Sequence, residues 1–143
     1  MKDTNQQLIA QNQRLLQNLN TERHCKCEVN QLVSEIIGNR IDSTTEIRLP
    51  FYTDFGRNIK IGKNVFINSN VMLADKGGIE IEDDVEIGSS VHILSADPTL
   101  QTEKVIIKKG AKIGSGSIIY PGVVIDRDVK IMPGSIIKNS VKK

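Results

Sequence analysis

Few side chains in this 143-residue sequence could act as a base, a nucleophile or a soft-metal ligand near neutral pH. The chain has two histidines, His24 and His92, and two cysteines, Cys25 and Cys27, at C-x-C spacing. If the cysteines lie in a helix, their side chains point about 200° apart, because successive helical residues are rotated by about 100°. We therefore expect two ordinary reduced thiols and no intrachain disulfide. Two cysteines and two widely separated histidines also give no full ligand set for structural zinc, so no metal is expected.

The elements that must position these side chains are dominated by one six-residue motif. Residues 107–142 repeat it without a gap, as IKKGAK, IGSGSI, IYPGVV, IDRDVK, IMPGSI and IKNSVK. A fixed short period predicts a solenoid. Three short strands per coil explain the period, since each strand sends one aliphatic side chain inward before the chain turns, and small residues fit the corner. The motif specifies a core that can stack and carries no chemistry by itself.

The repeat extends upstream with two interruptions. Six-residue phase begins at Leu49 (LPFYTD, FGRNIK, IGKNVF, INSNVM, LADKGG), slips by two residues at 76–78, and restarts at Ile81 as IEDDVE, IGSSVH and ILSADP. A larger interruption covers residues 99–106. Insertions in solenoids project as loops from one edge, and such loops commonly carry function. We therefore expect the functional site at residues 97–104.

Residues 1–40 are expected to form an N-terminal helical cap, and residues 41–143 the repeat domain. The first helix, over residues 2–20, is rich in Gln and Asn and carries its leucines on one side, so it is weakly amphipathic and needs a partner surface. The second helix is expected to begin with Thr21 as its N-cap and to stop at Gly38. Repeat proteins need such caps at their open ends.

Composition narrows the classes of function. The chain has 19 Lys and Arg against 17 Asp and Glu, a net charge of +2 that is too close to neutral to favour nucleic-acid binding. Aromatic residues make up 3% and Trp is absent, which fits a narrow core of Ile and Val. No apolar run could cross a bilayer and no signal-peptide pattern is present, so we expect a cytoplasmic protein without a membrane partner. The exposed strand edges of a short solenoid predict lateral association.

The stretch PFYTDFGRNIKIGKNVFINSNVMLAD at residues 50–75, together with the repeats, resembles the maltose/galactoside O-acetyltransferases. The resemblance runs from about Thr21 to the end of the sequence. It implies an all-β solenoid, namely a left-handed parallel β-helix of hexapeptide repeats with a short N-terminal α-helical segment, that forms a homotrimer and uses acetyl-CoA as co-substrate. A sugar or similar hydroxyl acceptor would lie between two subunits, where an imidazole removes the hydroxyl proton during attack on the thioester.

The resemblance assigns site residues position by position. On the acceptor side, Asn70 of the Asn-x-Asn motif and Asp75 match the family's substrate-binding segment, although both residue types also suit repeat corners. On the cofactor side, small residues would let the pantetheine arm of CoA approach the backbone. A lysine would lie near the phosphates, and in this chain it stands one position earlier than the family's lysine. These predicted cofactor-binding residues are Gly114, Ser115, Ser117 and Lys138.

The catalytic histidine of the family is absent. Relatives read Thr-Ala-Thr-His-Pro where this chain reads Ser-Ala-Asp-Pro at residues 95–98, which places Asp97 at the position of the base, and the loop that follows is shortened. A carboxylate, with an ordinary pKa near ~4, is a much weaker base at neutral pH than imidazole unless burial raises that pKa. His92 lies one hexapeptide earlier, so we expect it on a different face of the prism, about 120° away, because three strands complete a coil.

Three interpretations stay open. The first is an acetyl-CoA-dependent O-acetyltransferase of low activity that uses Asp97 as a weak base. The second is a catalytically silent trimeric hexapeptide-repeat protein with a binding or assembly role, which is favoured by the missing histidine, the shortened loop and the lack of the family's C-terminal Gly-x-Pro-Ala segment. The third is a remnant of a longer gene product.

Overall fold

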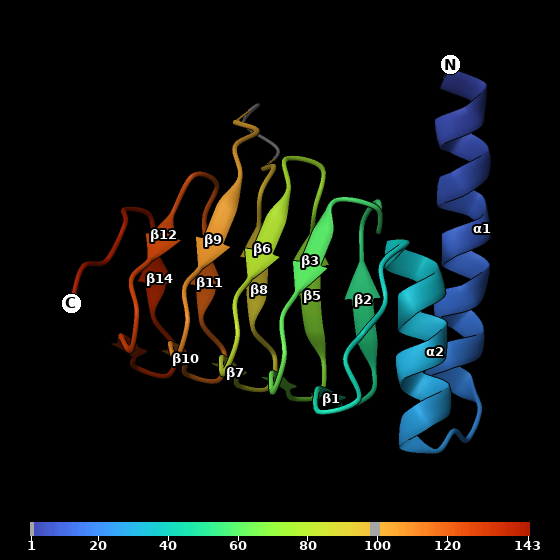
Figure 1. The fold of residues 1–143 in the computed structure, drawn as a ribbon. Coiled ribbons are helices and arrows are strands. Elements are labelled where there is room, and N and C mark those ends of the chain that lie inside the picture. Colours follow the sequence, from blue (N-terminus) through green and yellow to red (C-terminus); the bar gives the residue numbers. More distant parts are fainter. Residues whose placement is uncertain (1, 98–100) are drawn as a thin grey trace.

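The computed structural model describes residues 2–97 and 101–143, in which two helices are followed by fourteen short strands. The strands pair in parallel and form three sheets. Figure 1 shows the coils stacked side by side along one axis, with the helices at one end and the C-terminus at the other. The chain is thus a left-handed parallel β-helix, and the predicted fold class is confirmed.

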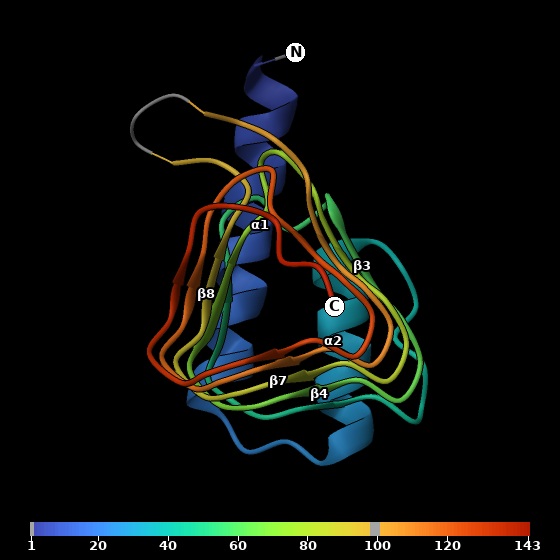
Figure 2. The same cartoon turned by 90° about the vertical axis from the view of Figure 1, so that its left-hand side faces the viewer.

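The chain visits sheets A, B and C in turn: each of the first four coils contributes one strand to every sheet, and the fifth contributes one each to sheets A and B. Sheet A consists of β1 (Glu46–Ile47), β4 (Phe66–Ile67), β7 (Glu86–Ile87), β10 (Lys112–Ile113) and β13 (Lys130–Ile131). Sheet B consists of β2 (Phe51–Thr53), β5 (Val71–Ala74), β8 (His92–Leu94), β11 (Ile118–Ile119) and β14 (Ile136–Ile137). Sheet C consists of β3 (Ile59–Ile61), β6 (Ile79–Ile81), β9 (Val105–Ile107) and β12 (Val124–Ile125). Viewed along the axis, the three sheets enclose a triangular prism (Figure 2).

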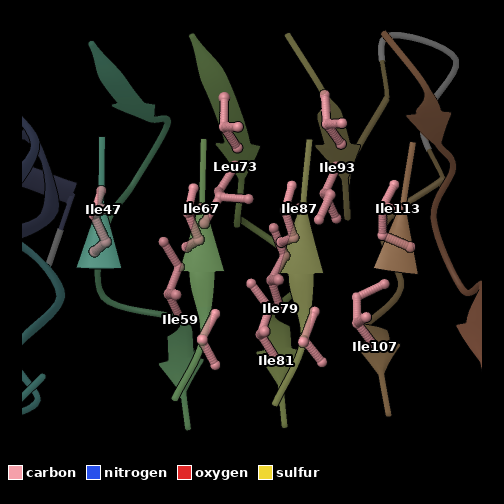
Figure 3. Close-up of a cluster of buried hydrophobic side chains, with 14 of the residues drawn as sticks. Ile47, Ile59, Ile67, Leu73, Ile79, Ile81, Ile87, Ile93, Ile107 and Ile113 are labelled. Carbon is pink, nitrogen blue, oxygen red and sulfur yellow. The ribbon is translucent and has the colours of Figure 1, made fainter. Parts of the chain in front are cut away.

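The interior of the prism is filled by aliphatic side chains from successive strands. Ile67 and Ile87 are paired in register, as are Leu73 and Ile93, and all four are fully buried. Figure 3 shows these side chains in rows that run along the axis. Burying one such side chain stabilises the fold by about 1.5–3 kcal/mol, so the repeated isoleucine is what holds the coils together.

The predicted six-residue phase is wrong in the first coil. Phe51 and Thr53 point inward and pair with Val71 and Leu73, whereas Phe55, which the pattern placed in phase, is only partly buried. The first coil contains two extra residues after Thr53, and these shift the frame. From Ile61 onward the predicted phase agrees with the strands of the structure.

Coils differ in length because of insertions at a single corner. The paired isoleucines of sheet A, which are Ile47, Ile67, Ile87, Ile113 and Ile131, are separated by 20, 20, 26 and 18 residues. Each extra residue lies in the connection from sheet B to sheet C. The predicted slip at 76–78 is one of these insertions, and the longest runs from residue 95 to residue 104. An antiparallel bridge between Ala96 and Thr102 makes the longest insertion a projecting loop (Figure 2), of which residues 98–100 lie outside the described residues.

Helices α1 (Lys2–Thr21) and α2 (Lys26–Ile37) cover the open end of the first coil (Figure 1). The Asn20 side chain donates to the carbonyl of Phe51 at 3.0 Å and accepts from its N–H at 2.9 Å, so that α1 bonds to the backbone of β2. Helices and coils share one hydrophobic core, and a domain boundary after residue 40 stays a prediction. Neither described helix is long and apolar enough to cross a membrane.

The predicted end of α2 is confirmed and its predicted start is wrong. Gly38 has a φ of 71° and its N–H donates to the carbonyl of Ser34 at 2.9 Å, which is the left-handed helix cap that glycine favours. Thr21 instead ends α1, and the N-cap of α2 is Cys25. The hydroxyl of Thr21 donates to the carbonyl of Gln17 at 2.7 Å and is therefore not available to cap α2.

Candidate functional site

The predicted site residues lie along two edges of the prism that flank sheet B. The A–B edge consists of the turns between sheets A and B, at residues 68–70, 88–90, 114–116 and 132–134. The B–C edge consists of the connections from sheet B to sheet C, at residues 54–58, 75–78, 95–104 and 120–123. Asn70, Gly114 and Ser115 lie at the A–B edge, whereas Asp75, Asp97 and Lys138 lie at the B–C end of sheet B.

A groove of about 440 Å³ runs along the A–B edge, and Gly114 and Ser115 form part of its wall. A Cβ atom on Gly114 would lie 2.6 Å from the carbonyl oxygen of Ile131, and one on Gly88 would lie 2.6 Å from the N atom of Ser115. Side chains at these two positions would not fit, so the backbones of neighbouring coils stack closely along the groove. A groove wall without side chains at these two positions suits a slender ligand that approaches the main chain.

Two lysines on the outer face of sheet A line the same groove. Lys112 and Lys130 are neighbours in the pairing of β10 with β13. The ammonium of Lys112 lies 4.0 Å from the Glu86 carboxylate, and Lys130 makes no ion pair with the described residues. Sequence reasoning missed both lysines. Each lysine directly precedes the inward isoleucine of its repeat, and residues at that place point outward from the same sheet. This shared position is the signal that could have identified them.

Ser115 and Ser117 take different positions in the same turn. Ser115 is exposed, and its Oγ accepts from the N–H of Ser89 at 3.1 Å. Ser117 is fully buried, and its hydroxyl donates to the carbonyl of Met132 at 3.2 Å. A ligand in the groove can therefore meet Ser115 directly, while Ser117 fixes the backbone of the adjacent coil.

Asn70 lies at the same edge, two coils toward the helices. Its φ is 64°, its N–H donates to the carbonyl of Pro50 at 2.7 Å, and its side chain donates to Oγ of Ser90 at 3.1 Å. Ser90 and Gly116 hold the corresponding left-handed positions in the next two coils, with φ values of 57° and 75°. Asn70 therefore stabilises the turn, and its exposed side chain also faces solvent. Its contact with an acceptor substrate stays a prediction.

The carboxylate of Asp75 is buried and bonded to the backbone of the preceding coil. Oδ1 accepts from the N–H groups of Phe55 and Gly56 at 2.8 and 2.9 Å, and Oδ2 accepts from those of Gly56 and Asn58 at 2.8 and 3.0 Å. Asp75 has no exposed surface. Asp75 therefore stabilises the two-residue insertion of the first coil. Contact with an acceptor would require these hydrogen bonds to break.

Asp97 stands where the projecting loop leaves sheet B. Its N–H donates to the carbonyl of Gln101 at 3.0 Å, and the N–H of Gln101 lies 3.4 Å from its Oδ1. The residue as a whole is partly exposed. Of the predicted region 97–104, residues 98–100 lie outside the described residues.

His92 and Asp97 flank the same strand, so the prediction that they lie on different faces is wrong. His92 begins β8, and Asp97 follows shortly after that strand ends at Leu94. The reason is that the last residue of each hexapeptide already belongs to the next strand. His24 lies just before α2, at the helical end of the prism.

Lys138 follows β14 and lies against Tyr120 of the preceding coil. Its Nζ is 5.4 Å from the centre of the Tyr120 ring, within the range of a cation–π contact. A strand of sheet B separates it from the groove at the A–B edge, so one chain does not bring Lys138 together with Gly114 and Ser115.

A second cavity, of about 340 Å³, lies where the B–C edge meets sheet C, and four basic residues line it: Arg57, Lys60, Lys76 and Lys104. Lys104 donates to Glu80 at 2.7 Å, and this hydrogen bond holds the pKa of Glu80 below its ordinary value. The sequence contained no repeat-based signal for this cluster, because Arg57, Lys76 and Lys104 come from insertions in three different coils.

The outer face of sheet B carries a row of largely apolar side chains between the two edges. The row consists of Tyr52, Met72, His92, Ile118 and Ile136, which pair in register from β2 to β14. Tyr52 is 40% exposed and Ile136 is 61% exposed. The corresponding row on sheet A is mostly charged: Glu46, Phe66, Glu86, Lys112 and Lys130. The apolar face thus distinguishes sheet B.

Residues 2–97 and 101–143 contain no cluster of three or more His, Cys, Asp or Glu side chains that could hold a metal ion.

Comparison with known proteins agrees with this architecture. Residues 104–139 match the family model described as bacterial transferase hexapeptide (six repeats). No curated protein matches the chain. The repeat and the fold define a hexapeptide-repeat protein with a left-handed parallel β-helix.

Among solved structures, the chain is similar to a hexapeptide-repeat acetyltransferase from Vibrio cholerae O1 biovar eltor complexed with acetyl coenzyme A, with 27% identity, a TM-score of 0.87, and coverage of 95% of this chain and 79% of that one. It is also similar to a maltose O-acetyltransferase from Clostridium difficile 630, with 25% identity, a TM-score of 0.86, and coverage of 95% and 78%. A galactoside acetyltransferase in complex with coenzyme A shares the fold, with 24% identity, a TM-score of 0.81, and coverage of 94% and 72%. The predicted resemblance to the maltose/galactoside O-acetyltransferases is confirmed.

Proposed function

We propose that this protein is an acetyl-CoA-dependent O-acetyltransferase that acts on a sugar or similar hydroxyl acceptor and works as a homotrimer. The observation that carries the proposal is the groove at the A–B edge, because predicted cofactor residues Gly114 and Ser115 lie on its wall. The acetyltransferase from Vibrio cholerae, which has the same fold, was solved with acetyl coenzyme A.

The groove fits the chemistry of CoA. Gly88 and Gly114 let neighbouring coils stack closely, so no side chain from these two positions narrows the groove for a pantetheine arm. Lys112 and Lys130 lie beside it and can meet phosphate groups as point charges. Met132, which is 73% exposed, adds an apolar wall.

The proposed site is completed by a second copy of the chain. The A–B and B–C edges lie on opposite sides of sheet B, as Asn70 and Asp75 illustrate: five residues of extended chain, or roughly 16 Å, separate them. A small acceptor cannot bridge that span on one chain. In a head-to-tail ring, the groove of one copy faces the B–C edge of its neighbour, and three copies close the ring. The apolar face of sheet B is the surface we expect to be buried in that assembly.

Asp97 is the residue we assign as the base. The acceptor hydroxyl oxygen would form a bond to the acetyl carbon while its proton passes to the Asp97 carboxylate; the C–S bond then breaks, and the departing CoA thiolate takes the proton from Asp97 and becomes the free thiol. A general base typically supplies ~10²–10⁴-fold in rate, and a carboxylate at neutral pH supplies less than an imidazole. We therefore expect slow turnover that depends mainly on positioning.

The second candidate is a catalytically silent trimer with a binding or assembly role. It is favoured by Asp97 at the place of the family's histidine and by Asp75, whose carboxylate is committed to the backbone. It predicts an intact trimer and groove without transfer of an acetyl group.

Calorimetry with acetyl-CoA, followed by a thiol-release assay over a panel of sugars, separates these candidates. The matched pair of variants is Asp97→Asn at the B–C edge and Asp128→Asn at an exposed turn between sheets C and A, which is the third edge of the prism. Binding with turnover that Asp97→Asn lowers at least about tenfold, and that Asp128→Asn leaves unchanged, supports Asp97 as the base. Binding without turnover supports the silent trimer, and the absence of any binding refutes the enzyme.

A further inference from the structure

The proposed function uses neither cysteine, yet the two thiols lie in contact. Cys25 is the N-cap of α2, with φ −74° and ψ 166°, and its Sγ lies 3.2 Å from the Sγ of Cys27. The expectation that the side chains point about 200° apart is wrong, because it treated both residues as helical. An extended N-cap residue instead folds its side chain back over the first turn of the helix, where Cys27 lies.

Both thiols are accessible, and both are free. Cys27 lies on the rim of a cavity of about 470 Å³ between the start of α2 and residues 40–43, beside Lys26 and Arg40. A small solute can therefore reach the pair. The thiol of Cys25 donates to Oε1 of Glu28 at 3.3 Å, and the hydrogen bond with Cys25 raises the pKa of the Cys27 thiol.

We propose that Cys25 and Cys27 are a modification site at which a low-molecular-weight disulfide forms a reversible intrachain disulfide. The thiolate of one cysteine attacks the small disulfide, a protein–small-molecule S–S bond forms, and one small thiol leaves. The second cysteine attacks the bound sulfur of the first, which expels the second small thiol. The protein loses two hydrogens and the small disulfide is reduced to two thiols, so atoms and electrons balance.

The 3.2 Å contact between the sulfur atoms favours the second step. Well-placed intramolecular reactions proceed at effective concentrations far above those of solutes, so the mixed disulfide is consumed faster than it accumulates. The pair lies at the start of α2, whereas Gly114 and Ser115 lie between β10 and β11, and Figure 1 shows these strands toward the other end of the prism. The inference is independent of the proposed acetyltransferase activity.

The test is exposure of the full chain to oxidised glutathione at mildly alkaline pH, with intact mass and free-thiol counts before and after. The expected product has lost two hydrogens, has no free thiol, exceeds the glutathione adduct at least about tenfold, and returns to the starting mass with dithiothreitol. Cys25→Ser and Cys27→Ser each change one exposed atom and should instead accumulate a stable glutathione adduct.

Three results would overturn the proposal. Wild-type protein could retain the glutathione adduct as its main product, as the single-cysteine variants do. It could form disulfide-linked dimers in place of the intrachain bond. Its thiols could also remain free under conditions that fully oxidise a small dithiol included as a control.

Discussion

Replacing Asp75 by Asn tests whether this side chain holds the first coil or serves an acceptor. Its carboxylate accepts four hydrogen bonds from three backbone N–H groups, those of Phe55, Gly56 and Asn58, and is fully buried. Asparagine keeps one oxygen and turns an NH2 group toward N–H donors that have no other acceptor. A buried donor left unsatisfied costs about 1–3 kcal/mol, and the remaining bonds lose the help of the negative charge. We therefore expect Asp75→Asn to lower the free energy of unfolding by about 2–4 kcal/mol.

Asp83→Asn is the matched control. Asp83 also accepts from a backbone N–H of the preceding coil, that of Lys63 at 2.8 Å, but it does so in an exposed turn. Water can replace that single bond, so the expected loss is below about 1 kcal/mol. The assay is equilibrium unfolding in urea, followed by circular dichroism at one fixed protein concentration, because assembly makes stability depend on concentration. An Asp75→Asn variant as stable as wild type that loses acetyl transfer would refute the structural role and support acceptor contact.

Three further predictions concern the groove, the helical cap and the assembly. Gly114→Ala places a Cβ 2.6 Å from the carbonyl of Ile131, so we expect a loss of stability in urea and acetyl-CoA binding weakened at least about tenfold by calorimetry. Both ring nitrogens of His24 have acceptors, and the hydrogen bond to Glu28, whose Oε2 lies 3.1 Å away, is the main cause that raises the pKa of His24 and lowers the pKa of Glu28. The stability that protonated His24 contributes is lost as pH rises through its raised pKa, and the stability that ionised Glu28 contributes is lost as pH falls through its lowered pKa. The melting temperature should therefore show a plateau at mildly acidic pH, and His24→Ala should remove that plateau. Ile136→Lys puts a charge on the apolar face of sheet B and should reduce the sedimentation mass to that of one chain; an unchanged trimer would show that this face stays outside the interface.

The repeat predicted the solenoid because each strand with its turn carries the same six-residue pattern, which can be recognised without knowing the rest of the structure. Prediction failed where the chain departs from the repeat. Two extra residues after Thr53 shifted the frame of the first coil, so Phe51 rather than Phe55 fills the core. The conformation of Cys25 depended on whether it caps the helix or belongs to it, and sequence pattern alone did not decide this.

For a related reason, the sequence predicted only part of the candidate site. Gly114 and Ser115 follow from the resemblance, but the groove they line also depends on Lys112 and Lys130. These lysines share one outward position in two repeats, and the resemblance did not show that this position lies beside Gly114 and Ser115. The partners of Asp75 are 17–20 residues earlier in the chain, and only the stacking of coils brings them together.

Calorimetric titration of acetyl-CoA tests the central claim, that the groove at the A–B edge is a cofactor site. The comparison is between wild type, Ser115→Gln, which fills the groove, and Ser69→Gln, which changes the corresponding turn two coils away, outside the groove lining. The account predicts one binding site per chain in wild type, at least about tenfold weaker binding in Ser115→Gln, and unchanged binding in Ser69→Gln, because a filled groove excludes the pantetheine arm. No binding to wild type, or equal binding to wild type and Ser115→Gln, would contradict it.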